Sequence, residues 1–115
     1  IRSELHAVVQ ALSREDYAAA AAALRHDPEA PWTAERLEQA LVDFRASYGA
    51  VVFDHRARLS DKTVIRRLEP GLWEVTQILC DRDADDYWSM DGIVDIRDVE
   101  DLDDDPIVML ERLGV

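Results

Sequence analysis

Residues 81–86 carry the pattern that comes closest to a metal-binding loop. Asp81, Asp83 and Asp85 offer carboxylates at positions 1, 3 and 5, as a calcium loop of the EF-hand type does. Such a loop also needs Gly at position 6 and Glu at position 12, where this sequence has Asp86 and Gly92. The pattern therefore favours a solvated turn between two strands, and we assign no metal site to it.

A second Asp-rich segment, residues 98–105, lies near the end of the chain. Of the 25 acidic residues, 13 fall in residues 81–115, which hold only 3 of the 13 basic residues, so the net charge of −12 is concentrated there. We expect residues 98–105 to form an exposed hairpin loop; the alternatives are a mimic of nucleic acid or a docking patch for a basic partner. The acidic excess argues against a general phosphate-binding surface.

The histidines and the single cysteine do not form a catalytic or metal-binding group. His6, His26 and His55 fall in three different predicted elements without metal-ligand spacing. Asp54 and His55 are adjacent, but neighbours on a strand point to opposite faces and cannot form a dyad. Cys80 is expected to be a small buried residue rather than a nucleophile. We therefore predict no catalytic residue in this chain.

An inward-facing amide on the strand predicted over residues 72–80 is the best candidate for a binding pocket. Strand alternation places Gln77 on the same face as the apolar Val75. The interpretation we favour is a buried amide whose hydrogen bonds are satisfied by neighbouring backbone. A different register would turn Asp95 or Tyr48 inward instead. The pocket candidates are Trp73, Gln77, Leu79 and Trp88.

Basic residues concentrate in the first two predicted strands, where five occur between positions 56 and 67. Alternation would put two of them, Arg56 and Arg58, on one face of a strand over residues 50–58. The favoured interpretation is a solubilising outer face, in which surface ion pairs contribute only about 0–1 kcal/mol each. The candidates for contact with nucleic acid are Arg56, Arg58, Arg66 and Arg67.

The elements that would position these residues begin with three predicted helices. Apolar residues recur at helical spacing over residues 1–12, an Ala-rich run follows over residues 18–23, and a third apolar stripe covers residues 37–48. Ser13 is expected to cap the second helix and Thr33 the third. Trp32 is expected to pack on the start of the third helix, and Gly49 to end it.

From residue 50 the hydrophobic period changes to two, which predicts strands over residues 50–58, 63–69, 72–80, 87–97 and 107–113. Pro70 and Gly71 predict a hairpin turn, and Gly92 predicts a bulge. Trp73 and Trp88 are expected to pair across neighbouring strands. The sequence therefore predicts one α+β domain over residues 1–115, with three N-terminal helices packed on an antiparallel sheet of four to five strands.

This order of elements resembles the nuclear-transport-factor-like (cystatin-like) fold, in which a strongly bent antiparallel sheet forms a cone around its helices. In that superfamily a segment similar to residues 12–17 commonly joins the first two helices. The resemblance implies a bent sheet here. Many relatives with this fold are isomerases, cyclases or dehydratases, whose pockets lie between the sheet and the helices.

A closer resemblance covers most of the chain. Residues 30–38, 44–49, 73–81, 92–96 and 106–114, together with Trp88, resemble the C-terminal uncharacterised domain of bacterial DEAD/DEAH-box helicases. The resemblance implies a parent protein that uses ATP and Mg²⁺. This chain has neither a G-x-x-x-x-G-K-[ST] phosphate loop nor a D-E-x-[DH] box, so we expect no cofactor in it. The chain does not begin with Met, and we expect it to be the C-terminal tail of a longer protein.

The function that follows is a non-catalytic accessory domain of an ATP-dependent helicase. It would dock on the helicase core of the same polypeptide, pair with a second copy, or meet nucleic acid through the parent. The alternatives are a small-molecule-binding or lyase/isomerase-like pocket domain, and direct contact with nucleic acid. A single cysteine suits the cytoplasm, and no apolar run approaches the ~20 residues of a membrane span.

Overall fold

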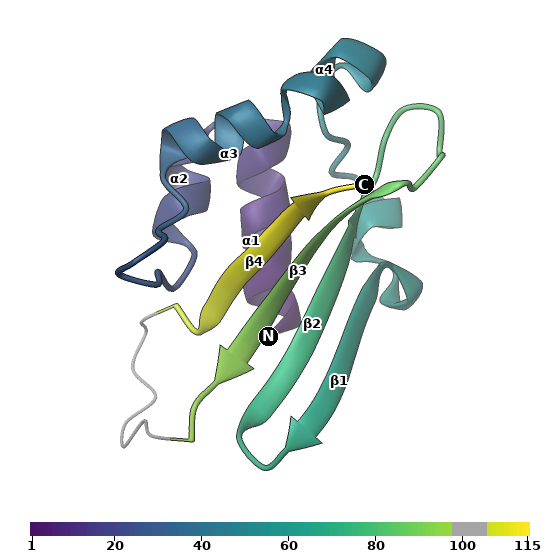
Figure 1. Cartoon of the computed structure of the whole chain (residues 1–115). Coiled ribbons are helices and arrows are strands. Elements are labelled where there is room, and N and C mark those ends of the chain that lie inside the picture. The colour runs from purple at the N-terminus through teal and green to yellow at the C-terminus, as the bar shows by residue number, and fades with distance from the viewer. Residues whose placement is uncertain (98–105) are drawn as a thin grey trace.

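The computed structural model describes residues 1–97 and 106–115, and the second Asp-rich segment, 98–105, lies outside them. Within the described residues the chain is α+β, with four helices and a four-stranded antiparallel sheet. The helices come first along the chain (Figure 1). They are α1 (Arg2–Ser13), α2 (Tyr17–Ala22), α3 (Ala34–Ala40) and α4 (Val42–Tyr48).

The helices differ from the prediction in number and in one cap. The third predicted helix is interrupted at Leu41, where neither Pro nor Gly stands, so three helices become four. The interruption lets α3 pack against α2 and β4 while Phe44 of α4 reaches the far end of the sheet. Ser13 is the last residue of α1, and Asp16 caps α2 by accepting from the Ala19 amide.

The strands form a meander in which each pairs with the next in sequence, in the order β1-β2-β3-β4. A tight turn between β1 and β2 and hydrophobic alternation along the strands favour this simple topology. Gly71, with a φ of 82°, forms the predicted turn between the first two strands. The strands are β1 (Thr63–Glu69), β2 (Leu72–Leu79), β3 (Trp88–Asp95) and β4 (Val108–Gly114).

The strand predicted over residues 50–58 is wrong. Only Val52 makes a bridge, to Cys80, and the chain then forms the short 3-10 turn η1 (His55–Arg58). The cause is local, because the Asp54 carboxylate accepts a hydrogen bond from the Arg56 amide and so caps a turn where a strand was expected. A second short turn, η2 (Ser60–Lys62), leads into β1.

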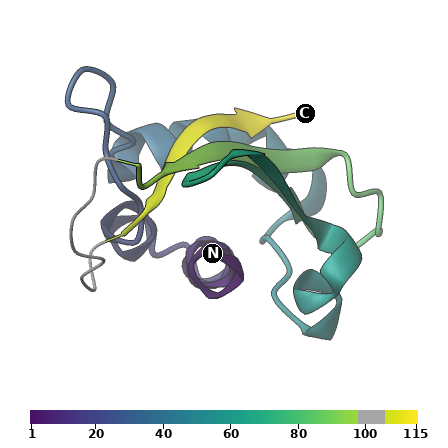
Figure 2. The same cartoon turned by 90° about the horizontal axis from the view of Figure 1, so that it is seen from below.

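The helices cover only one face of the sheet. Figure 2 shows the sheet curving around α1, and no helix of the described residues lies on the opposite, outer face. Between them lies the hydrophobic core, to which α1 contributes four fully buried residues at helical spacing. The strands contribute the alternate, inward-facing positions. The main core residues are Leu5, Val8, Val9, Leu12, Leu37, Leu41, Phe44, Val75, Leu79, Met90, Val94, Val108 and Leu110.

The predicted irregularity at Gly92 is confirmed. The register between β3 and β4 shifts between Asp91 and Gly92, and Glu111 of β4 has no partner there. A Cβ on Gly92 would lie 2.7 Å from the Met109 carbonyl oxygen, so this close approach of two strands requires glycine.

Candidate functional site

The candidate pocket around Gln77 is part of the packed interior. Gln77 is 0% exposed, as alternation predicted, and its side chain accepts a hydrogen bond from the Thr63 hydroxyl. Its Nε2 donates to the Ala57 carbonyl at 3.4 Å. Leu79, two residues along the same face, is also fully buried. The amide is therefore held by protein groups: its nitrogen bonds to backbone carbonyls, as we expected, whereas its oxygen accepts from the Thr63 side chain and not from backbone.

The two tryptophans of this face lie at opposite ends of it. Trp73 is opposite Val94, and Trp88 is opposite Leu79, so the predicted Trp73–Trp88 pair is wrong. The pairing depends on register, which alternation alone does not fix. Trp88 instead packs edge-on against Phe44, with ring centroids 5.5 Å apart.

Neither of the alternative inward residues lines this face. The Tyr48 hydroxyl donates to Asp85 at 2.8 Å, and this hydrogen bond raises the pKa of Tyr48 to about 12. Asp95 accepts from the Arg97 guanidinium and backbone, which lowers the pKa of Asp95 to about 2. Both groups take part in exposed contacts between a strand or helix and a loop.

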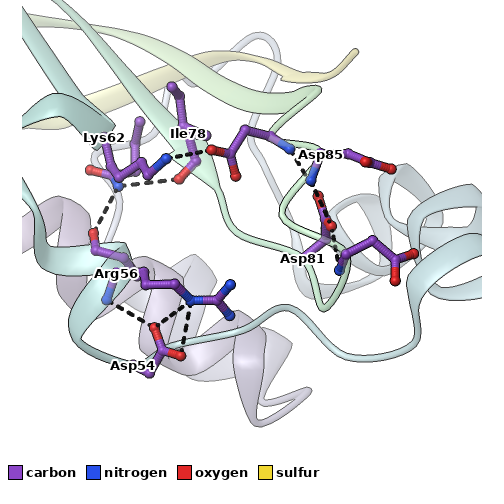
Figure 3. A network of polar contacts seen from close by, with 10 residues as sticks. Asp54, Arg56, Lys62, Ile78, Asp81 and Asp85 are labelled. Carbon is purple, nitrogen blue, oxygen red and sulfur yellow. Dashed lines mark hydrogen bonds and ion pairs between the residues drawn. The ribbon is translucent and has the colours of Figure 1, made fainter.

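The first Asp-rich segment is a tightly ordered turn built around one carboxylate. Asp81 is 0% exposed, and its two oxygens accept from the backbone amides of Asp83, Asp85 and Asp86 at 2.9–3.1 Å. Figure 3 shows Asp81 inside the loop and Asp85 on its rim. Left-handed backbone at Ala84 and Asp86 lets the loop fold around Asp81.

Three carboxylates of this turn lie close enough together to be compared with a metal site. Oxygens of Asp81, Asp83 and Asp85 come within 4.8 Å of one another. The hydrogen bonds to Asp81 explain its burial without a metal, and the other two side chains are exposed. The geometry fits the solvated turn that the sequence favoured, and among the described residues no histidine joins the group.

One ion pair ties this turn to the residue just before β1, and a second lies nearby at η1. Lys62, the last residue of η2, pairs with Asp86 of the turn, and Arg56 of η1 pairs with Asp54 at 3.2 Å (Figure 3). Cys80 is buried close to both pairs, and burial raises the pKa of its thiol. A buried thiol of raised pKa is a poor nucleophile, which agrees with the structural role expected for Cys80.

The four arginines proposed for contact with nucleic acid do not form one surface. Arg56 is paired with Asp54, and Arg58 lies over the Phe53 ring at 5.6 Å. Arg58 is also near His6, where burial and then the charges of Arg2 and Arg58 lower the pKa of the imidazole. The η1 turn replaces the expected strand, so Arg56 and Arg58 share no strand face.

The other two arginines lie on the first strand of the sheet. Arg66 and Arg67 are neighbours on β1, so they point to opposite faces of the sheet. Both are exposed, and within the described residues neither takes part in an ion pair.

Sequence reasoning missed a shallow cavity of about 220 Å³ between the segment before α3 and strand β4. Arg36 lies over the Trp32 ring at 3.8 Å and forms one wall with it. The spacing of Trp32 and Arg36, four residues apart at a helix start, was the available signal. Asp27 and Glu111 add acidic groups to the basic one, so the mixed lining specifies no ligand class.

Comparison with known proteins gives a family. A family model described as "Domain of unknown function (DUF3516)" matches residues 1–112, nearly the whole chain. No curated protein and no solved structure matches the sequence. Within the described residues, none of the helices has both the length and the apolar character needed to cross a membrane.

Proposed function

We propose that this chain, which belongs to the DUF3516 family of domains of unknown function, is a non-catalytic interaction domain. The observation that carries the proposal is the one-sided cover of the sheet: helices pack on the inner face, and the outer face is open (Figure 2). On β1, Val64 and Leu68 are apolar and 54% and 42% exposed. Exposed apolar side chains on a sheet that the described helices leave uncovered on one face are typical of a surface that meets another protein.

Three buried polar side chains of β2 and the turn after it support the same proposal. Gln77 and Asp81 are fully buried, and their hydrogen bonds go to the protein itself. The Cys80 thiol is buried with a raised pKa. A general base or a nucleophile must be able to reach a substrate. The alternative of a small-molecule-binding pocket gains no support from Gln77, because its amide is already hydrogen-bonded to other groups of the protein.

The parent protein in this proposal is a bacterial DEAD/DEAH-box helicase of the cytoplasm, of which this chain is the C-terminal domain. The resemblance of residues 30–38, 44–49, 73–81 and 106–114 supports it. ATP and Mg²⁺ would then be bound elsewhere in the parent. The curvature of the sheet around α1 supports the related proposal of a nuclear-transport-factor-like fold. Docking on the helicase core, pairing with a second copy and an indirect role at nucleic acid all fit an interaction domain.

The test compares three forms of the full-length protein: wild type, a form that lacks residues 1–115, and a form with Val64→Asp and Leu68→Asp. The readouts are ATP hydrolysis without nucleic acid, its stimulation by nucleic acid, strand separation, and mass in solution. We expect basal hydrolysis to persist in all three forms, and coupling or assembly to change in the second and third. Full-length protein without ATPase activity, or equal behaviour of all three forms, would refute the proposal.

A further inference from the structure

Strand β1 forms an edge of the sheet that no other described segment covers. Within the described residues its only strand partner is β2, and it lies at the open side of the sheet (Figure 1). In an antiparallel pair every second residue turns its backbone N–H and C=O away from the partner strand. These groups on β1 are therefore free to pair with an added strand.

The two ends of β1 are anchored and the middle is free. Lys62 pairs with Asp86 just before β1, and Glu69 pairs with Arg97 at its end. Between these ion pairs lie residues 64–68, four of which are exposed. An added strand would therefore meet four residues, 64–67, that are held in regular register with β2, followed by an irregularity at Leu68. A segment held in extended conformation in advance lowers the entropy cost of binding.

The side chains of the free segment specify the character of the added strand. On the outer face Arg66 follows Val64, and on the inner face Arg67 follows the half-buried Ile65. The exposed Leu68 lies at the register irregularity between Arg67 and Glu69. In an antiparallel register an incoming strand would present an apolar residue to Leu68, acidic residues to Arg67 and Arg66, and apolar residues to Ile65 and Val64. Opposite charges and apolar pairs across strands are both stabilising.

A second copy of the chain fits this edge poorly. When two β1 strands pair about a two-fold axis near Ile65 or Arg66, arginines of the two copies come directly opposite or diagonal to each other. Like charges at these positions destabilise the pairing. Residues 64–68 hold two arginines and no acidic residue in a chain of net charge −12, and within the described residues neither arginine is in an ion pair, so the local charge favours an acidic partner.

We propose that the β1 edge binds an extended acidic peptide segment of a partner by strand addition. This inference rests on the proposed function, since it names the kind of partner that the interaction domain binds. Backbone hydrogen bonds would supply affinity, and the side chains of residues 64–68 would supply specificity. Nucleic acid is the weaker occupant, because Val64 and Leu68 flank Arg66 and have no role in binding phosphate.

The probe is a fluorescein-labelled peptide with the core Leu-Glu-Glu-Ile-Val, and its binding to the full 115-residue chain is followed by fluorescence anisotropy at low salt. We expect saturable binding, and a loss of about tenfold or more in affinity with Arg66→Glu and Arg67→Glu together. The matched control is Arg2→Glu with Arg14→Glu, which changes the net charge equally on exposed residues of α1 and its C-terminal cap. If the first variant loses its circular dichroism spectrum, R66Q with R67Q replaces it.

Three further probes distinguish strand addition from simple charge attraction. A peptide of the same composition in the order Glu-Leu-Ile-Glu-Val should bind more weakly. Methylation of alternate peptide amides should abolish binding for one set of positions and leave it nearly unchanged for the other. A twelve-nucleotide oligo-dT should bind no better than the peptide.

The proposal fails if the peptide does not bind, if both methylated sets bind equally, or if the arginine variants bind like wild type. It also fails if oligo-dT alone depends on Arg66 and Arg67. These results are separable from the test of the proposed function. Peptide binding by this chain can succeed when deletion of the domain changes nothing in the full-length protein, and deletion can matter when the peptide fails to bind.

Discussion

The two edges of the sheet are built from similar sequences and have opposite surroundings. Strand β4 has the sequence VMLERLG, and β1 has the sequence TVIRRLE. On β4, three residues are buried, and Arg25 closes the free side: its amide donates to the Val108 carbonyl at 2.8 Å. On β1 only Thr63 is buried, and no segment of the described residues lies beyond it.

The comparison shows that strand composition does not decide which edge is closed. Each strand mixes Arg, Glu and branched apolar residues, yet β4 is part of the core and β1 is surface. The segment after α2 makes the difference, because it places Arg25 beside β4, where the guanidinium also donates to the Asp95 carbonyl at 2.9 Å. An edge is closed by a neighbour from elsewhere in the chain, and an edge without one is available to a partner.

The largest expected effect on stability comes from replacing a leucine of β4 by alanine, and the same replacement on β1 gives the comparison. Leu110 of β4 is 5% exposed, and Leu110→Ala should lower the free energy of unfolding by about 2–5 kcal/mol through lost burial and a cavity. Leu68→Ala on β1 should cost about 0.5 kcal/mol or less, since Leu68 is largely exposed. Urea denaturation followed by circular dichroism measures both, and equal losses would contradict the contrast between the edges.

The ion pair between Lys62 and Asp86, just before β1, depends on the turn that positions Asp86. Asp81→Asn should lower the free energy of unfolding by about 1.5–3 kcal/mol, because an amide nitrogen would face a backbone N–H where a carboxylate oxygen now accepts. Asp83→Asn, on an exposed residue of the same turn, is the matched control and should change little. Similar losses in the two variants would show that the Asp81 carboxylate does not order the turn.

The close approach of β3 and β4 is tested at Gly92. Gly92→Ala places a methyl group 2.7 Å from the Met109 carbonyl oxygen, so the strands must separate, at a cost of about 1–3 kcal/mol. Gly114→Ala near the end of β4 meets its nearest neighbour, the Arg112 guanidinium, at 3.6 Å and should be close to neutral. Thermal unfolding of both variants gives the comparison, and a neutral Gly92→Ala would mean that the strands yield without strain.

The smallest effect is electrostatic and concerns the end of β1. Arg97 pairs with Glu69 of β1 and with Asp95 of β3, and it lowers the pKa of Asp95 to about 2. The contribution of Asp95 to stability is therefore present above its ordinary pKa of 3.8 and is lost as the pH falls through about 2.

Arg97→Leu should return the pKa of Asp95 toward its ordinary value, as measured by titration of the carboxyl carbon in NMR spectra. Arg112→Leu removes an arginine that pairs with Asp91 instead, and should leave Asp95 unchanged. An unaltered titration of Asp95 without Arg97 would show that another group holds its pKa low.

Local patterns predicted most of the elements. The Thr33 cap, the helix end at Gly49, four of the five strands and the bulge at Gly92 are all confirmed. The strand predicted over residues 50–58 was wrong because the Asp54 carboxylate accepts a hydrogen bond from the nearby Arg56 amide. This local hydrogen bond favours a turn and competes with pairing to a distant strand. The interruption at Leu41 was missed because it depends on where α3 and α4 pack.

The sequence predicted the position of a candidate site residue only where the alternation of a single strand decided it. Gln77 was placed inward by alternation along β2 alone. The separation of Arg56 from Arg66 and the cavity between Arg36 and Glu111 needed segments far apart in sequence to be positioned first. The burial of Asp81 was missed for another reason, since turn geometry rather than periodicity directs three amides to its carboxylate.

The sequence alone determined the type of most elements and which side of β2 faces the core, because steric limits and hydrophobic period act over a few residues. The tertiary structure decided that Arg25 covers β4 and that β1 remains open. That outcome depends on pairing and packing between segments dozens of residues apart, which no local pattern records.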